Sequence, residues 1–240
     1  MTRGERMMTS IQHPSQQWQT AACEVVAIAE DGLWSSGGEC ALAYLLECGL
    51  TAHTIRSARL GYVVGHIGER RDIAGLDVPC GMIIPWFAAD MLWAVSVRQD
   101  NEHPRHIPIA GSSHEGLYNA DSLHHNSIAL ICDCELDVLL IQQEAGDLLT
   151  PVTLGSTTAR LTARWYGKLV GQRQMLIAYG QGMWGQRGTR ELLKFSPRLK
   201  QLRLPEGKNI PDFFLNGGDI HAWISEALQE MQPEVNRNGH

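Results

Sequence analysis

The sequence has no apolar run of the roughly 18–20 residues that a membrane-spanning helix requires, which excludes such a helix. Its first 18 residues also lack the apolar stretch of a secretory signal. The six cysteines form no Cys-x-x-Cys pair and show no His/Cys spacing typical of zinc, so neither a zinc finger nor a disulfide framework is indicated. We therefore expect a cytoplasmic protein with reduced thiols and no membrane partner.

The composition is that of an ordinary globular protein. Of the 240 residues, 44% are hydrophobic and 19% are charged, which is enough for a substantial core and argues against disorder. The length allows one large domain or two small ones. Residues 1–14 and 231–240 are polar, and we expect both termini to be loose.

Charge is unevenly distributed along the chain. The net charge is −6, yet residues 155–208 contain eleven basic and two acidic residues, which leaves −15 on the rest. This asymmetry favours a polyanion as a partner for one face, although solvated helix faces would give the same composition. Arg187, Arg190 and Lys194 repeat at i, i+3 and i+7, so they share one face of a predicted helix.

Hydrophobic periodicity divides the chain into two regions of different organisation. Residues 15–120 predict a mixed α+β subdomain with an antiparallel ribbon. Its helices are expected within residues 18–50, with Gly49 ending the second of them, and its strands at 60–67, 81–87, 91–99 and 105–111.

In residues 121–230, strands and helices alternate, which predicts a parallel sheet covered by helices, with ligands at the carboxyl ends of the strands. The strands are expected at 127–132, 151–156, 174–179 and 199–204, the last at an edge. The helices are expected at 136–146, 157–170, 188–195 and 219–231, the second capped by Ser156 or Thr157. The predicted fold class is α/β.

Three carboxylates follow the first of these strands. Asp133, Glu135 and Asp137 lie within five residues, and oxygen ligands of this kind suit Mg²⁺. Acids at a helix N-terminus also stabilise the helix, which is the plainer interpretation of the same residues. The residue pattern alone leaves both open.

The order of several segments resembles the primase-type TOPRIM proteins of phages, plasmids and mobile elements. The similarity is carried by ALAYLLECGL, LGYV, GMIIPWF, VSVRQ and PRHIPIAG, and then by motifs in the second region. The resemblance implies a primase-core-like N-terminal subdomain followed by a TOPRIM domain. It also implies that Arg98 and Arg105 approach a nucleic-acid strand.

The catalytic motifs of that family are altered in this sequence. Its first motif, Glu-Gly-Glu-x-Asp, reads Asp133-Cys134-Glu135-Leu136-Asp137, so Asp133 takes the place of the proposed general acid/base. Its second, Asp-x-Asp-x-x-Gly, holds magnesium, and both aspartates are glycines here, at 180 and 182. The third motif is reduced to Lys208 and Asp212. The resemblance thus implies that Asp133, Asp137 and Asp212 would hold a metal only weakly.

The lost aspartates bear on function because nucleotidyl transfer needs Mg²⁺ to neutralise and align the reacting phosphates. We therefore expect a catalytically inactive primase-like protein that binds single-stranded DNA or RNA during replication of a mobile element. A helicase or another replication protein is the expected partner, and no cofactor is certain. The alternative is an active primase or nuclease that uses Mg²⁺ at a reduced acidic site.

A second alternative uses the glycines themselves. Gly180, Gly182 and Gly185 form a Gly-x-Gly-x-x-Gly pattern between a strand and a helix, with Arg187 and Lys208 expected nearby. Such a loop can bind a phosphate through backbone N–H groups without a metal, which would suit a nucleotide-binding regulator. The same glycines also suit a simple turn. A dinucleotide site is disfavoured because the pattern follows the third strand of the sheet rather than the first.

Overall fold

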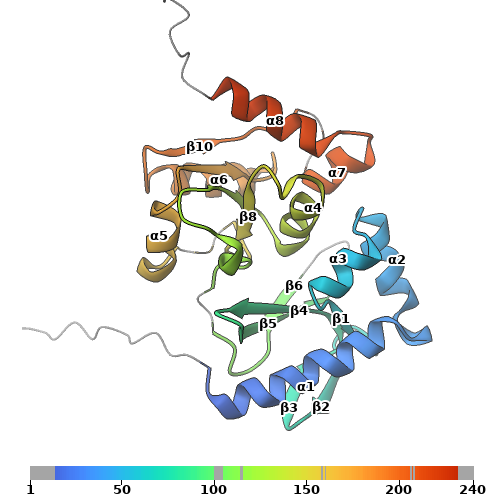
Figure 1. Cartoon of the computed structure of the whole chain (residues 1–240). Helices are drawn as coiled ribbons and strands as arrows, with labels where there is room; N and C mark the ends of the chain where they lie inside the picture. The colour runs from blue at the N-terminus through green and yellow to red at the C-terminus, as the bar shows by residue number, and fades with distance from the viewer. Residues whose placement is uncertain are drawn as a thin grey trace, which may run out of the picture.

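The computed structural model describes residues 14–99, 105–113, 116–157, 159, 161–205, 207 and 209–231. The two expected loose termini lie outside these residues, apart from Pro14 and Met231. An N-terminal part and a C-terminal part are stacked on each other, with α3 and α4 facing across the boundary (Figure 1). Among the described residues, no helix is long and apolar enough to cross a membrane.

The N-terminal part is built on a four-stranded antiparallel sheet in the order β1-β4-β5-β6. Its strands are β1 (Gly61–Val63), β4 (Gly81–Ala88), β5 (Met91–Gln99) and β6 (Arg105–Pro108). Helix α1 (Gln16–Leu33) begins at Ser15, whose hydroxyl accepts the Trp18 N–H. Its apolar residues, spaced three and four apart, form a core with one face of this sheet.

The other face of this sheet is covered by α2 (Glu39–Glu47) and α3 (Ala52–Ser57), which follow the short η1 (Ser36–Gly38). Gly49 ends α2 with a φ of 89°, as expected for a glycine after a helix. Helix α3 and the two-stranded ribbon of β2 (Arg70–Ile73) and β3 (Leu76–Pro79) were not expected from the sequence.

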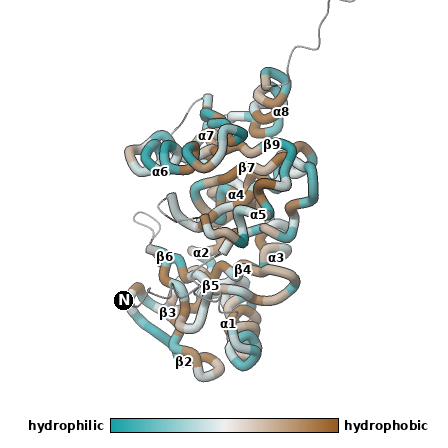
Figure 2. The backbone as a smooth tube through the Cα atoms, turned by 90° about the vertical axis from the view of Figure 1, so that its left-hand side faces the viewer, coloured by the Kyte–Doolittle hydropathy of each residue, from teal (hydrophilic) through white to brown (hydrophobic). Residues whose placement is uncertain are grey.

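The C-terminal part contains a four-stranded parallel sheet in the order β10-β9-β7-β8. Its strands are β7 (Ile128–Cys132), β8 (Thr150–Thr153), β9 (Gln174–Ala178) and β10 (Leu199–Gln201). The parallel sheet and the edge position of β10 are confirmed. Figure 2 shows β7 and β9 as apolar interior segments and α6 as a largely hydrophilic one.

The remaining helices follow these strands. They are η2 (Ala120–Ser122), α4 (Glu135–Ala145), α5 (Ala163–Val170), α6 (Met183–Leu193), α7 (Ile210–Leu215) and α8 (Ile220–Glu230). Two predicted helix starts were wrong. Helix α5 begins after Thr162, not after residue 156 or 157, because the threonine-rich residues before it are weak helix formers. Helix α6 begins at Met183, five residues earlier than expected, because its glycines conceal the helical pattern.

A single hydrophobic cluster runs through both parts. It joins Leu45 and Ile55 beneath the first sheet to Trp86 on β4 and Leu140 on α4. The boundary is also held by polar contacts, since Gln143 on α4 accepts the Thr51 N–H at 2.8 Å and donates to the Gly49 carbonyl at 2.9 Å. The two parts are therefore packed against each other over a shared core.

Candidate functional site

The carboxyl ends of β7 and β9 lie side by side because these strands pair in parallel. This pairing brings together the two altered motifs that the sequence analysis identified. The Gly180 N–H donates to Oδ2 of Asp133 at 2.6 Å. The second oxygen, Oδ1, is buried and has no partner among the described residues. Burial raises the pKa of Asp133 from its usual 3.8 to about 6, partly offset by the Gly180 hydrogen bond.

Asp137 lies in the first turn of α4, three residues after the N-cap Cys134. It is 4% exposed, and burial raises its pKa to about 7, with the negative charge of Asp133 as the second cause. Hydrogen bonding from Cys134 and the charge of Arg98 act in the opposite direction. The hydrogen bond to the N-cap residue is the contact of a helix-capping acid, but burial outweighs it and disfavours the charged form of Asp137.

Glu135 contacts the N-terminal sheet. Its Oε1 accepts the indole N–H of Trp86 at 3.0 Å, and its Oε2 lies 3.9 Å from Nδ1 of His106. The side chain is 1% exposed, and Oε2 has no hydrogen-bond partner among the described residues. Glu135 thus joins α4 to β4 and β6 across the boundary.

These acids do not combine into a metal centre. Asp133 and Glu135 each direct one oxygen to an N–H group of a different strand or loop, and the carboxylate of Asp212, on α7, accepts from the Asn216 amide at 3.4 Å. Among the described residues, no three His, Cys, Asp or Glu side chains are grouped so that they could hold a metal ion. Among the described residues, these acids are therefore not gathered as the ligands of a magnesium ion would be.

The loop that contains Gly180, Gly182 and Gly185 differs from an open phosphate-binding loop. Its first N–H, at Gly180, is occupied by the Asp133 carboxylate, whose charge would repel a phosphate. A Cβ at Gly185 would lie 2.0 Å from the Gly180 carbonyl oxygen, so this glycine is required for close packing. Gly182, the N-cap of α6, has open space around it. This arrangement favours a tight turn over the predicted phosphate loop.

The predicted basic residues of the N-terminal part are differently placed. Arg98, on β5, is 9% exposed and donates to the Tyr44 hydroxyl at 2.6 Å. Its Nε is buried without a partner among the described residues. Arg105 pairs with Gln99 in the sheet, but its side chain lies outside the described residues, as does all of Lys208.

The basic face of α6 is exposed, as the sequence spacing predicted. Arg187, Arg190 and Lys194 all reach solvent, while Gly185, Gly188, Thr189 and Leu192 are buried beneath them. Trp184 is 56% exposed, and the Arg187 guanidinium lies 6.0 Å from its ring centroid. We refer to Trp184, Arg187, Arg190 and Lys194 as the α6 surface. Trp184 was not among the candidate residues predicted from the sequence, although a Trp three residues before an Arg on a polar helix was a usable signal.

A polar cleft of about 470 Å³ borders the α6 surface. It lies between α6 and the segment after β10, at the carboxyl ends of β9 and β10, and both Arg190 and Arg203 line it. The carboxyl ends of parallel strands are where ligands of open α/β sheets usually bind.

Comparison with known proteins identifies the fold. No family model matches the chain, and no curated protein matches it either. Solved structures do match: the DnaG primase catalytic domain bound to single-stranded DNA has a TM-score of 0.69 at 15% identity, with 89% of this chain and 78% of that chain covered. The RNA polymerase domain of Mycobacterium tuberculosis primase DnaG, in complex with a double-stranded DNA oligomer with a 6-nucleotide overhang, has a TM-score of 0.69 at 14% identity, covering 92% and 82%.

The primase fragment of the bacteriophage T7 primase-helicase protein is similar as well, with a TM-score of 0.61 at 15% identity and coverage of 76% and 72%. The chain therefore has the fold of primase catalytic cores, with a TOPRIM-like parallel-sheet part. This finding confirms the predicted fold class and the primase-like resemblance at the level of the fold.

Proposed function

We propose that this protein uses a primase-type fold to bind single-stranded DNA or RNA through the α6 surface, without a metal ion and without nucleotidyl transfer. The observation that carries the proposal is an exposed tryptophan beside three exposed basic side chains on one helix. Aromatic rings stack on unpaired bases, and basic side chains contact the phosphates that connect them. The polar cleft lined by Arg190 and Arg203 borders this surface and offers further contacts for the nucleic-acid backbone.

Two further parts of the proposal rest on the fold comparison and the altered motifs. A protein of this kind would act in the replication of a mobile element, in the cytoplasm, where its six free cysteines stay reduced. A helicase or another replication protein is the proposed partner, because the T7 neighbour is a fragment of a primase-helicase protein.

The binding surface is tested by two matched double variants. In the first, Arg187→Glu is combined with Arg190→Glu. In the second, Arg70→Glu is combined with Arg71→Glu on the exposed β2 strand, which changes the net charge equally. Affinity for a labelled single strand of about 16 nucleotides is measured between about 50 and 200 mM salt.

We expect the α6 variant to lose affinity and to lower the slope of log K against log salt by about 1.4, which corresponds to two phosphate contacts. The β2 variant should keep the wild-type slope. Equal losses in both variants would show that the effect is one of net charge, and would overturn the α6 surface as the binding site.

The absence of catalysis is tested separately, by primer synthesis and strand nicking in Mg²⁺ or Mn²⁺. We expect neither activity. Template-directed synthesis that disappears with Asp133→Ala would instead establish the alternative, an active enzyme with a reduced acidic site that uses Mg²⁺.

A further inference from the structure

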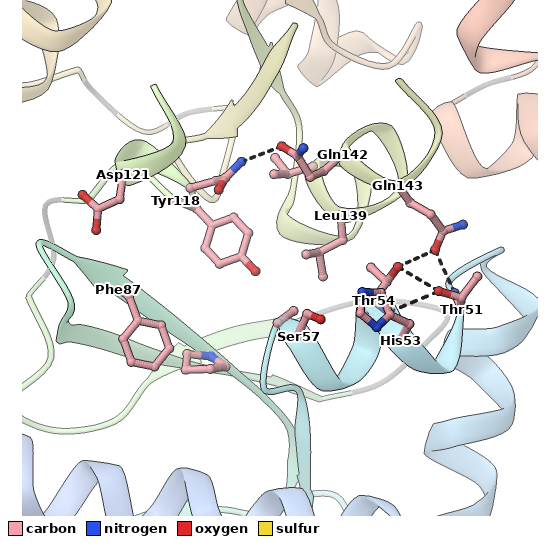
Figure 3. Close-up of a pocket in the computed structure, with 14 residues that line it drawn as sticks. Thr51, His53, Thr54, Ser57, Phe87, Tyr118, Asp121, Leu139, Gln142 and Gln143 are labelled. Carbon is pink, nitrogen blue, oxygen red and sulfur yellow. Dashed lines mark hydrogen bonds between the residues drawn. The ribbon is translucent and has the colours of Figure 1, made fainter. Parts of the chain in front are cut away.

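A cleft of about 540 Å³ opens at the boundary between the two parts. We call it the α3–α4 cleft. One wall comes from α3 and β4 and the other from α4 and the segment before η2 (Figure 3). Its lining residues are Thr51, His53, Thr54, Ser57, Ala58, Pro85, Phe87, Tyr118, Asn119, Asp121, Val138, Leu139, Gln142 and Gln143.

The walls of this cleft are apolar and partly aromatic. Phe87 and Pro85 come from β4, the Tyr118 ring lies across from them, and Val138 and Leu139 come from α4. Trp86 holds the Tyr118 ring in place from behind, at 5.5 Å between ring centroids. Flat apolar side chains that face one another in a cleft of this size suit a planar ligand.

Hydrogen-bonding groups stand at defined points in the cleft. The Tyr118 hydroxyl points toward the side where Ser57 and Leu139 lie (Figure 3). Among the described residues, neither this hydroxyl nor that of Ser57 has a hydrogen-bond partner. The Thr51 and Thr54 hydroxyls, by contrast, are 2.9 Å apart, and Thr54 donates to Gln143 at 2.7 Å. The hydroxyls of Tyr118 and Ser57 are thus available to a ligand, next to the hydrogen-bonded side chains of Thr54 and Gln143.

The charge of the lining decides what kind of ligand fits. Among the described residues, no Lys or Arg side chain lines the cleft, and Asp121 carries its one carboxylate. The Asp121 carboxylate is paired with Lys168 at 3.4 Å. The exposed imidazole of His53 is the one basic group that a phosphate would find among the described lining residues. An uncharged heterocycle would find aromatic walls and hydroxyl groups that can both donate and accept.

We propose that the α3–α4 cleft is a binding site for an uncharged, nucleobase-sized heteroaromatic molecule. Because the walls belong to different parts of the chain, the ligand would be held between α3 and α4 and would stabilise their packing. The inference does not rest on the proposed function, since none of the α6 surface residues lines this cleft.

The test uses adenosine as the probe, with amide shifts in the full chain as the readout. We expect saturable shifts at Ser57, Tyr118 and Leu139. Ser57→Trp should fill the cleft from its exposed α3 side and weaken adenosine binding at least tenfold. Gln17→Trp, which adds the same ring to an exposed site on α1, should bind like the wild type. Tyr118→Phe keeps the ring and removes the hydroxyl, and should weaken binding about 2- to 10-fold.

Two results would overturn this proposal. One is the absence of saturable shifts at the cleft residues with millimolar adenosine. The other is adenosine binding that Ser57→Trp leaves unchanged. Loss of nucleic-acid binding in the α6 variants would leave adenosine binding intact, so the failure of one proposal is distinguishable from the failure of the other.

Discussion

The strand-tip acids, Asp133, Glu135 and Asp137, follow β7, whereas the α6 surface follows β9, and the two regions differ in almost every physical property. Asp133, Glu135 and Asp137 are enclosed, bonded to N–H groups and joined to the packing of the boundary. Trp184, Arg187 and Arg190 are open to solvent. The family resemblance implies that acids at these positions hold a metal. Here their contacts are those of structural residues, so a change in the acids should alter stability, and a change on α6 should alter binding.

The largest expected effect is on the free energy of unfolding, and it distinguishes Trp86 from Trp184. Trp86→Ala removes a side chain that is 9% exposed and leaves Glu135 without its indole partner, so it should cost about 3–5 kcal/mol of unfolding free energy. Trp184→Ala, at 56% exposure, should cost less than about 0.5 kcal/mol of stability but about 1–3 kcal/mol of binding to a single strand. Denaturant unfolding and strand titration check both. A Trp184→Ala variant with unchanged affinity would show that Trp184 does not stack on a base of the bound strand.

The next effect concerns buried charge. Because the pKa of Asp137 is raised to about 7 in the folded state, that state binds the proton more tightly than the unfolded chain. The associated stability is full below about pH 4 and is lost as pH rises through about 7. Asp137→Asn removes this loss and should be more stable than the wild type at pH 8 by about 1–4 kcal/mol, with a smaller difference at pH 4.

Unfolding of both proteins is measured across this pH range, with Asp31→Asn at an exposed position of α1 as the control. A wild-type protein that gains stability between pH 4 and pH 8 relative to Asp137→Asn would show that the ionised Asp137 is paired favourably, contrary to the enclosed site described above.

A smaller effect on stability distinguishes Gly185 from Gly182. Gly185→Ala places a Cβ 2.0 Å from the Gly180 oxygen and should destabilise the protein by about 2 kcal/mol or more. Gly182→Ala meets nothing within 4 Å and should change stability by less than about 1 kcal/mol. Thermal or denaturant unfolding distinguishes them. Equal costs would mean that the close approach of α6 to Gly180 is not what requires glycine at 185.

The smallest effect is at Lys194. Its ion pair with Glu191, at 2.7 Å, joins two side chains that are 68% and 62% exposed, so Lys194→Ala should change stability by less than about 0.5 kcal/mol. If Lys194 contacts one phosphate, the same change should reduce the salt slope of strand binding by about 0.7. A slope that stays at the wild-type value would restrict the binding site to Trp184, Arg187 and Arg190.

How far the sequence could predict this molecule follows from the kind of signal each element carries. Strongly periodic or continuous apolar segments, such as those of α1, β7 and β9, placed their elements correctly, and the strand–helix alternation predicted the parallel sheet. Helix α3 has six residues and one buried side chain, Ile55, so its periodicity is too short to recognise. The start of α6 was not recognised because glycines, here at 182, 185 and 188, are typical of loops. In the structure, Gly185 and Gly188 instead let the helix approach neighbouring residues closely.

The candidate site shows the same difference between local patterns, which the sequence reveals, and long-range contacts, which it does not. Spacing along one helix predicted that Arg187, Arg190 and Lys194 share an exposed face, because that is a local property. Whether Arg98 faces solvent depends on Tyr44, which is 54 positions away and approaches only when α2 packs on the sheet. The Asp133–Gly180 hydrogen bond joins residues 47 positions apart for the same reason. Contacts of this range depend on tertiary packing, which local patterns do not encode.

The most direct test of the central claim is strand binding with and without a divalent metal. The affinity of wild-type protein for a labelled single strand is measured in EDTA and in Mg²⁺ at matched ionic strength, and then repeated with Asp133→Asn and with the Arg187→Glu, Arg190→Glu double variant. We expect equal affinity in EDTA and Mg²⁺, no change with Asp133→Asn, and a loss only in the α6 variant. Binding that requires Mg²⁺ and disappears with Asp133→Asn would contradict this expectation.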